Sequence, residues 1–186
     1  LQWKNIRFSF NEASLLPNNH PFNLKYQSFV DRFGDEGNLI VLAVQDSTLF
    51  SPNKIQQWSS LTKSFEGLDA VAAVTGIGNL KQLRKNTQQQ SFVVEDVPYQ
   101  LARDQQEVDK LEKKLLEQSS FFHGVLLNPD TEVYLTIITL KKKVVNAKER
   151  ELFVNNELLP KISAFEAASA MDVHISGMPY VRTINA

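Results

Sequence analysis

Residues 39–44, Leu-Ile-Val-Leu-Ala-Val, are the longest uninterrupted apolar stretch of the chain, and they constrain its fold more than any other segment. The stretch is far shorter than the ~20 residues that cross a bilayer, but it is typical of a strand at the centre of a sheet. We therefore predict a strand that is covered by helices on both faces, or by helices on one face and a neighbouring element on the other.

The residues that follow this stretch predict a helix and a second strand. Ser51-Pro52 is typical of a helix start, with Ser as the cap and Pro at the first helical position, and Gly67 ends the helix. The apolar stripe of this helix consists of Ile55, Trp58, Leu61 and Phe65, and we expect Trp58 to be buried. Residues 71–77 form the next apolar run, so residues 39–77 predict a β-α-β unit with parallel strands and a right-handed crossover.

The second half of the chain predicts a hairpin, a helix and a last strand. Asn128-Pro129-Asp130-Thr131 is typical of a turn, because Pro fixes φ and Asn and Asp bond to nearby backbone. Residues 121–127 and 132–140 then form a β-hairpin, followed by a helix over 146–168 and a strand over 172–176. The predicted order is β-α-β, an insertion, and β-β-α-β. We therefore predict an α+β fold, a ferredoxin-like split β-α-β sheet with helices packed on it.

Two segments add to this core. Residues 1–37 contain an opening strand, where Ile6, Phe8 and Phe10 alternate with polar residues, and a helix with apolar residues at helical spacing from residue 22 to residue 33. The insertion, residues 79–120, is polar and contains a charged helix after Pro98. The narrow apolar stripe of that helix consists of Leu101, Val108, Leu111 and Leu115. It predicts packing on this domain, or on a neighbouring domain or subunit, and greater mobility than the core.

Composition limits the classes of function. The chain of 186 residues suffices for one sizeable core, and its formal net charge of −1 lacks the basic footprint of a nucleic-acid-binding protein. The absence of cysteine excludes disulfides and thiolate metal sites. The run Lys141-Lys142-Lys143 predicts a solvated strand end, with a surface for acidic headgroups or a partner as the alternative. No initiator Met opens the sequence, and we expect the chain to be a piece of a larger protein.

Catalytic patterns are weak throughout the sequence. The histidines, without metal-ligand spacing, are His20, His123 and His174. Gly76-Ile77-Gly78 follows a strand as a dinucleotide loop would, but Lys81 replaces the third glycine. The carboxylates that bracket a loop rather than share a helix face are Asp31, Asp35, Glu36 and Asp46. We predict no catalytic, cofactor-binding or metal-binding residues, which makes an enzyme the weaker class.

Motifs spread along the chain carry a resemblance to a transporter family. In chain order they are Phe8-Ser9-Phe10, Leu15-Leu16-Pro17, Phe29-Val30-Asp31-Arg32-Phe33-Gly34, Leu49-Phe50-Ser51-Pro52, Val71-Ala72-Ala73-Val74-Thr75-Gly76 and Val173-His174-Ile175-Ser176-Gly177-Met178-Pro179. In this order and spacing the chain resembles the extracytoplasmic (porter) loop domain of the resistance-nodulation-division (RND) superfamily, in its MmpL-type branch of lipid and hydrophobe exporters.

The resemblance implies a bacterial inner-membrane protein of twelve helices, built as an internal repeat and driven by the proton gradient. This domain would lie in the periplasm as the first of two loop domains. Residues 1–37 would follow the first membrane helix, residues 38–177 would form the porter-type core, and residues 178–186 would lead to the second membrane helix. The implied partners are the membrane domain, the second loop domain, and a lipid or other hydrophobic substrate, and a homo-oligomer of the full-length protein stays open.

An apolar patch inside the polar insertion is the predicted contact surface for substrate or partner. Its residues are Phe92, Val93, Val94, Val97 and Tyr99. The alternative is that the patch packs the insertion onto its own core. For the whole chain, the function alternative to an exporter domain is a soluble regulatory or assembly module of split β-α-β type that binds a protein partner or a small effector.

Overall fold

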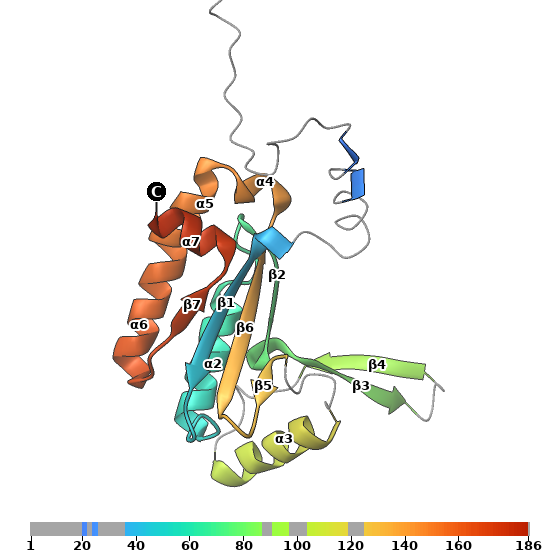
Figure 1. Cartoon of the computed structure of the whole chain (residues 1–186). Coiled ribbons are helices and arrows are strands. Elements are labelled where there is room, and N and C mark those ends of the chain that lie inside the picture. Colours follow the sequence, from blue (N-terminus) through green and yellow to red (C-terminus); the bar gives the residue numbers. More distant parts are fainter. Residues whose placement is uncertain are drawn as a thin grey trace, which may run out of the picture.

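The strands of the computed structural model form one main sheet and a separate two-stranded hairpin (Figure 1). The structure describes residues 20–21, 24–25, 36–86, 91–96, 104–118 and 125–185. The strands are β1 (Leu39–Gln45), β2 (Val71–Gly76), β3 (Lys81–Asn86), β4 (Ser91–Asp96), β5 (Leu127–Asn128), β6 (Val133–Leu140) and β7 (His174–Ser176). The longer helices are α2 (Pro52–Ser64), α3 (Gln105–Gln118), α5 (Lys148–Phe153), α6 (Leu159–Ser169) and α7 (Met178–Ile184). Short helical segments are η2 (Glu36–Asn38), η3 (Ile77–Asn79), α4 (Lys142–Val145) and the π-helical η6 (Val154–Leu158).

The main sheet has the strand order β2-β6-β1-β7, with the short β5 paired to β6, and all neighbours are antiparallel. Strands β1 and β2 are therefore parallel to each other with β6 between them, and β6 and β7 are parallel with β1 between them. Each parallel pair is connected through helices, α2 in the first case and α5 to α6 in the second. These are two interleaved split β-α-β units, so the predicted ferredoxin-like α+β fold is confirmed.

One face of the sheet is covered by α2 and α6. Side chains alternate along the strands, so Ile40, Leu42 and Ile138 point to the helices and are fully buried. From the helical side, the Trp58 ring packs on Phe165 with 5.6 Å between ring centroids. Trp58 is 0% exposed, which confirms its predicted burial. Burial of this apolar layer supplies the main stabilisation of the domain.

The insertion contains structure that the sequence did not predict. Its polar first half, for which we predicted no strands, forms the antiparallel β3–β4 hairpin. The charged helix was correctly predicted, and as α3 it begins at Gln105. Val108 and Leu115 of its stripe are buried in the domain core, so the stripe packs on this domain, which was the first of the two predicted possibilities. The start of α3 is held by the side chain of Gln105, whose Nε2 donates a hydrogen bond to the Phe50 carbonyl oxygen at 2.8 Å.

Several boundaries also differ from the prediction. The helix expected over 146–168 is divided into α5, η6 and α6, and α4 precedes it. Strand β6 ends at Leu140, just before the lysine run, and Lys142 and Lys143 already belong to α4, where both are exposed. The first strand of the predicted hairpin is only Leu127–Asn128, and the last strand is only His174–Ser176. The predicted opening strand and helix within residues 1–37 lie almost wholly outside the described residues.

Candidate functional site

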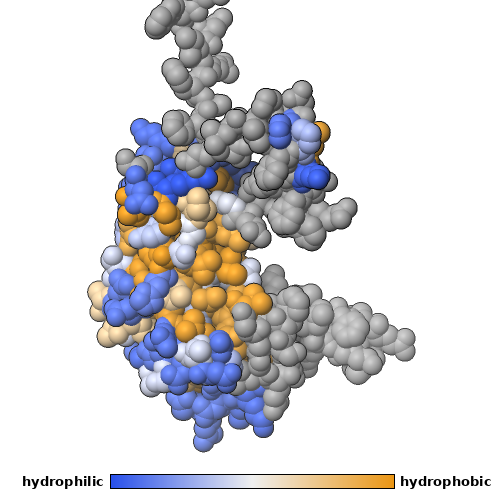
Figure 2. Space-filling view, viewed as in Figure 1, coloured by the Kyte–Doolittle hydropathy of each residue, from blue (hydrophilic) through white to orange (hydrophobic). Residues whose placement is uncertain are grey.

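The face of the main sheet opposite α2 and α6 is apolar and partly exposed. We call it the open face and define it by Val41, Ala43, Leu135 and Ile137, which alternate with the buried residues of β1 and β6. In the strand register Val41 lies opposite Ile137 and Ala43 opposite Leu135, so the four side chains form one cluster. Figure 2, which views the molecule from this side, shows a continuous hydrophobic area over the sheet.

The chemistry of the open face is that of a contact surface for apolar groups. Its four defining side chains are aliphatic, and the exposed His174 and Ser176 of β7 border it on one side. Thr75 of β2, which lies opposite Ile137, borders it on the other. A contiguous apolar patch with a polar border is typical of a surface that meets a partner or an apolar ligand. We expected both faces of residues 39–44 to be covered, but Val41 and Ala43 are partly exposed, which corrects this expectation for their face of the strand.

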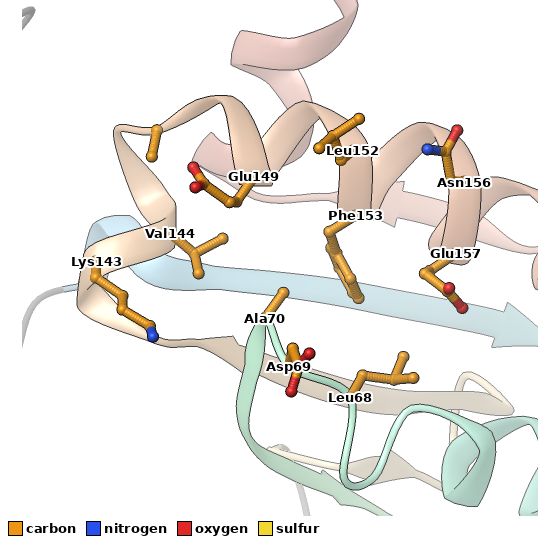
Figure 3. Close-up of a pocket in the computed structure, with 11 residues that line it drawn as sticks. Leu68, Asp69, Ala70, Lys143, Val144, Glu149, Leu152, Phe153, Asn156 and Glu157 are labelled. Carbon is orange, nitrogen blue, oxygen red and sulfur yellow. The ribbon is translucent and has the colours of Figure 1, made fainter.

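A cleft on the helical side of the domain is the second candidate site (Figure 3). It has a volume of about 570 Å³ and lies between the α2–β2 connection and the α5–η6 segment. Val144 and Phe153 form its buried apolar floor, with Leu68 and Ala70 on the facing wall. Leu152 lies at its rim and is 49% exposed.

Charged side chains surround the mouth of this cleft. Asp69 comes from the α2–β2 connection, Lys143 from α4, and Glu149 and Glu157 from the α5–η6 segment. Glu157 also pairs with Lys161 at 3.5 Å. Three carboxylates and one ammonium group around an apolar floor suit an amphipathic ligand whose polar part is cationic. The volume lies within the range of about 300–1,000 Å³ that is usual for small-molecule sites.

The predicted contact patch of the insertion is divided by the described range. Phe92, Val93 and Val94 lie on β4, opposite Lys85, Arg84 and Leu83 of β3. Val97 and Tyr99 lie outside the described residues. The hairpin that carries Phe92 to Val94 projects sideways from the main sheet (Figure 1).

The glycines that follow β2 have a packing role. A Cβ on Gly76 would lie 2.5 Å from Thr136 Oγ1, and a Cβ on Gly78 would lie 2.6 Å from the Ser59 Cα. Thr136 is itself held by a buried hydrogen bond to Thr62, with 3.0 Å between the hydroxyl oxygens. Gly76 and Gly78 thus let β2 and η3 approach β6 and α2 closely, so both positions need a residue without a side chain.

The remaining sequence candidates do not converge on one place. Among the described residues, no three His, Asp or Glu side chains are arranged to hold a metal ion. His20 and His174 are exposed, and His123 lies outside the described range. Asp46 is engaged in an ion pair with Lys54 at 2.6 Å, Glu36 lies in η2, and Asp31 and Asp35 are not described.

Comparison with protein-family models and with curated proteins finds no match for this chain. Within the part of the chain that the structure covers, no helix has the length and apolar character needed to traverse a bilayer. The functional conclusion therefore depends on the geometry of the domain and on the sequence resemblance.

Proposed function

We propose that this chain is a periplasmic porter-type domain of a proton-driven RND-superfamily exporter in the bacterial inner membrane. The observation that carries the proposal is the antiparallel pairing of β1 with β7, in which Val41 lies opposite Ser176. Through this pairing the first strand begins where the last strand ends, so the chain enters and leaves the sheet at the same end (Figure 1). A domain inserted between two consecutive membrane helices needs this arrangement.

The open face is the surface that we propose to contact the exported apolar or amphipathic substrate. Its aliphatic side chains bind such a molecule by excluding water, at ~25 cal/mol per Å² of apolar area buried. The face lies on a sheet whose other side is fixed by α2 and α6, so it moves as a rigid wall when neighbouring domains rock. The membrane domain and the second loop domain of the same polypeptide are the proposed neighbours.

In this proposal the domain guides substrate, and the coupling to protons belongs to the membrane helices. An ionisable residue inside the bilayer is where a proton gradient acts, and such residues lie outside this domain. The domain itself needs no catalytic group for this role. Asp46 is committed to Lys54 and Thr48 and has a structural role.

The first test is export by the full-length protein in inner-membrane vesicles, with fluorescent lipid as the probe. Ile137→Asn places an amide on the open face, and we expect export to fall several-fold while proton flux through the protein and its amount in the membrane stay unchanged. The matched control is Val125→Asn, because Val125 is 51% exposed and lies outside the open face. Equal export by both variants would contradict the proposed substrate path.

The second test is the sequence on either side of the chain. The proposal requires an apolar segment of about 20 residues shortly before Leu1 and another shortly after Ala186. Polar flanking sequence on both sides would refute an exporter and leave the alternative function.

The alternative is a soluble module that binds a small effector, and the cleft beside α5 favours it. The volume of about 570 Å³ and the buried floor of Val144 and Phe153 provide a place for such a ligand. Fluorescence titration with a cationic amphiphile distinguishes the two functions. Saturable binding that Phe153→Ala abolishes, in a protein without flanking membrane segments, would establish the effector module.

A further inference from the structure

The C-terminal helix α7 exposes an apolar stripe on one side. The stripe consists of Met178, Val181 and Ile184, which follow one another at a spacing of three residues and therefore share a helix face. Their side chains are 46%, 42% and 54% exposed, and they are half of the large exposed apolar residues in the described part of the chain. We call this surface the α7 stripe.

The other side of α7 is attached firmly to the domain. Pro179 is buried, and the Thr183 hydroxyl donates to its carbonyl oxygen at 2.9 Å. Arg150 Nε of α5 donates to Thr183 Oγ1 at 3.2 Å, and Arg182 donates to Asn146 Oδ1 at 3.2 Å. These bonds fix the rotation of the helix about its axis. The stripe consequently faces outward because its opposite side is anchored.

Basic residues gather at the end of the sheet where α7 lies. Helix α7 lies beside α5 and η2, and α4 lies beside the same two elements, so these helices gather at one end of the sheet (Figure 1). Segments 36–38, 141–151 and 177–185 contain six Lys or Arg residues and three Glu residues, whereas the whole chain has a net charge of −1. Among the basic residues Lys142, Lys143 and Lys148 are exposed. This end of the domain is therefore positive while the rest of the chain is negative.

We propose that the α7 end of the domain lies on a lipid bilayer with anionic headgroups. The α7 stripe inserts among the upper acyl-chain carbons, and Lys142, Lys143 and Lys148 meet the phosphate groups. A helix with apolar residues on one side and neighbouring lysines is suited to the interface between headgroups and acyl chains. The inference needs a membrane surface but neither transport nor an exported substrate, so it can fail or hold separately from the proposed function.

Charge and size favour a bilayer over a second copy of this chain. A symmetric dimer through α7 would bring two positive ends together, and like charges disfavour such a contact. A stable protein interface also buries about 800 Å² on each partner, which three side chains on a helix of seven residues do not supply. A bilayer needs no shape complementarity and attracts the lysines.

The test is sedimentation of the 186-residue chain with vesicles of phosphatidylcholine, alone or mixed with phosphatidylglycerol. We expect binding to the mixed vesicles that weakens as sodium chloride is raised, because salt screens the lysine–phosphate attraction. Val181→Ser with Ile184→Ser should lower the partition coefficient on the order of tenfold, and Lys142→Glu with Lys143→Glu should do the same. The matched controls are Val125→Ser for the apolar change and Lys110→Glu for the charge change, since both positions are exposed on other parts of the fold.

A second readout locates the contact. Val181→Trp should show a blue-shifted emission with mixed vesicles, and lipids brominated near the headgroup end of the acyl chain should quench it. Because Val181 is exposed, this variant and the serine variant should retain the circular dichroism and melting of the unaltered chain. Binding that is equally reduced by Val125→Ser, or no binding to mixed vesicles, overturns the inference. A concentration-dependent dimer that Val181→Ser with Ile184→Ser dissociates also overturns it, because the stripe would then be a protein interface.

Discussion

The backbone of Gly177 lies directly against the carbonyl group of Leu39. Any Cβ at position 177 would overlap the Leu39 oxygen and come within 3.0 Å of the Ile40 Cα. Gly177 also has a φ of 118°, a conformation that L residues with a side chain rarely adopt. At this contact the chain leaves β7 and enters α7 beside the start of β1. The points where the chain enters and leaves the sheet therefore lie together.

We expect Gly177→Ala to destabilise the domain by ~2–4 kcal/mol, because backbone strain and a collision with backbone atoms add to each other. Urea unfolding followed by circular dichroism measures this change. The control is Gly67→Ala, since Gly67 has a φ of 75° but nothing within 4 Å of the added Cβ. That variant should be destabilised only by the backbone strain, by about 1 kcal/mol. Equal losses of unfolding free energy at the two positions would mean that the backbone at Leu39 can shift away from the added Cβ without destabilising the fold.

Trp58 provides a test of the core. It is 0% exposed and packs on Phe165, so Trp58→Ala should leave a large cavity and cost ~3–5 kcal/mol. Within the described structure its indole Nε1 has no hydrogen-bond partner, so Trp58→Phe removes packing without removing a hydrogen bond. We expect a loss of only about 1–2 kcal/mol for that variant. Thermal melting of both variants measures the difference, and a Trp58→Ala protein that melts with the unaltered chain would contradict the burial.

The order of strands and helices could be predicted because each core element carries a clear local pattern. Ser51-Pro52 marks the start of α2, and the stripe with Ile55 and Trp58 fixes which side of that helix is buried. The alternation in residues 133–140 fixes the two faces of β6. These signals are local, and short connections leave few topologies for them.

The elements that could not be predicted depend on distant contacts. Residues 39–44 are apolar throughout, so the sequence alone does not distinguish a strand covered on both faces from one with an open face. The β3–β4 hairpin has a polar sequence without strong alternation, and its pairing of Lys85 with Phe92 is visible only in the structure. The cleft combines the segment at 68–70 with residues of 143–157, which no local pattern relates.

Asp46 predicts a pH dependence of stability. Its Oδ1 accepts hydrogen bonds from the backbone N–H and the hydroxyl of Thr48, both at 2.7 Å, and its Oδ2 pairs with Lys54 Nζ at 2.6 Å. Burial raises the pKa of the carboxyl, but the bonds from Lys54 and Thr48 outweigh this and hold the pKa below its ordinary value. A lowered folded-state pKa stabilises the fold above the unfolded-state value, and this contribution disappears as the pH falls through the folded-state pKa.

We therefore expect Asp46→Asn to be less stable than the unaltered chain at neutral pH, with a difference that shrinks as the pH falls through the folded-state pKa of Asp46. Urea unfolding at a series of pH values measures it. Lys54→Met removes the paired cation, and combining it with Asp46→Asn should add less than the sum of the single losses. Additive losses, or a difference that stays constant into acid, would show that Asp46 contributes nothing through its charge.

Helix α3 should open more readily than the sheet on which it packs. Among its described side chains, Val108 and Leu115 are buried in the core and Leu111 packs against it, and Gln105 adds a hydrogen bond to Phe50, whereas β1 is hydrogen-bonded on both sides, to β6 and β7. We expect the amides of 105–118 to exchange with deuterium well before those of 39–45, as measured by mass spectrometry.

Val108→Ala, which removes about 2 kcal/mol of buried contact, should speed exchange in α3 and leave β1 unchanged. Lys110→Ala, on the exposed side of the same helix, should change neither segment. If Val108→Ala speeds exchange in α3 and β1 equally, the helix and the sheet unfold as one unit, and the insertion is part of the core.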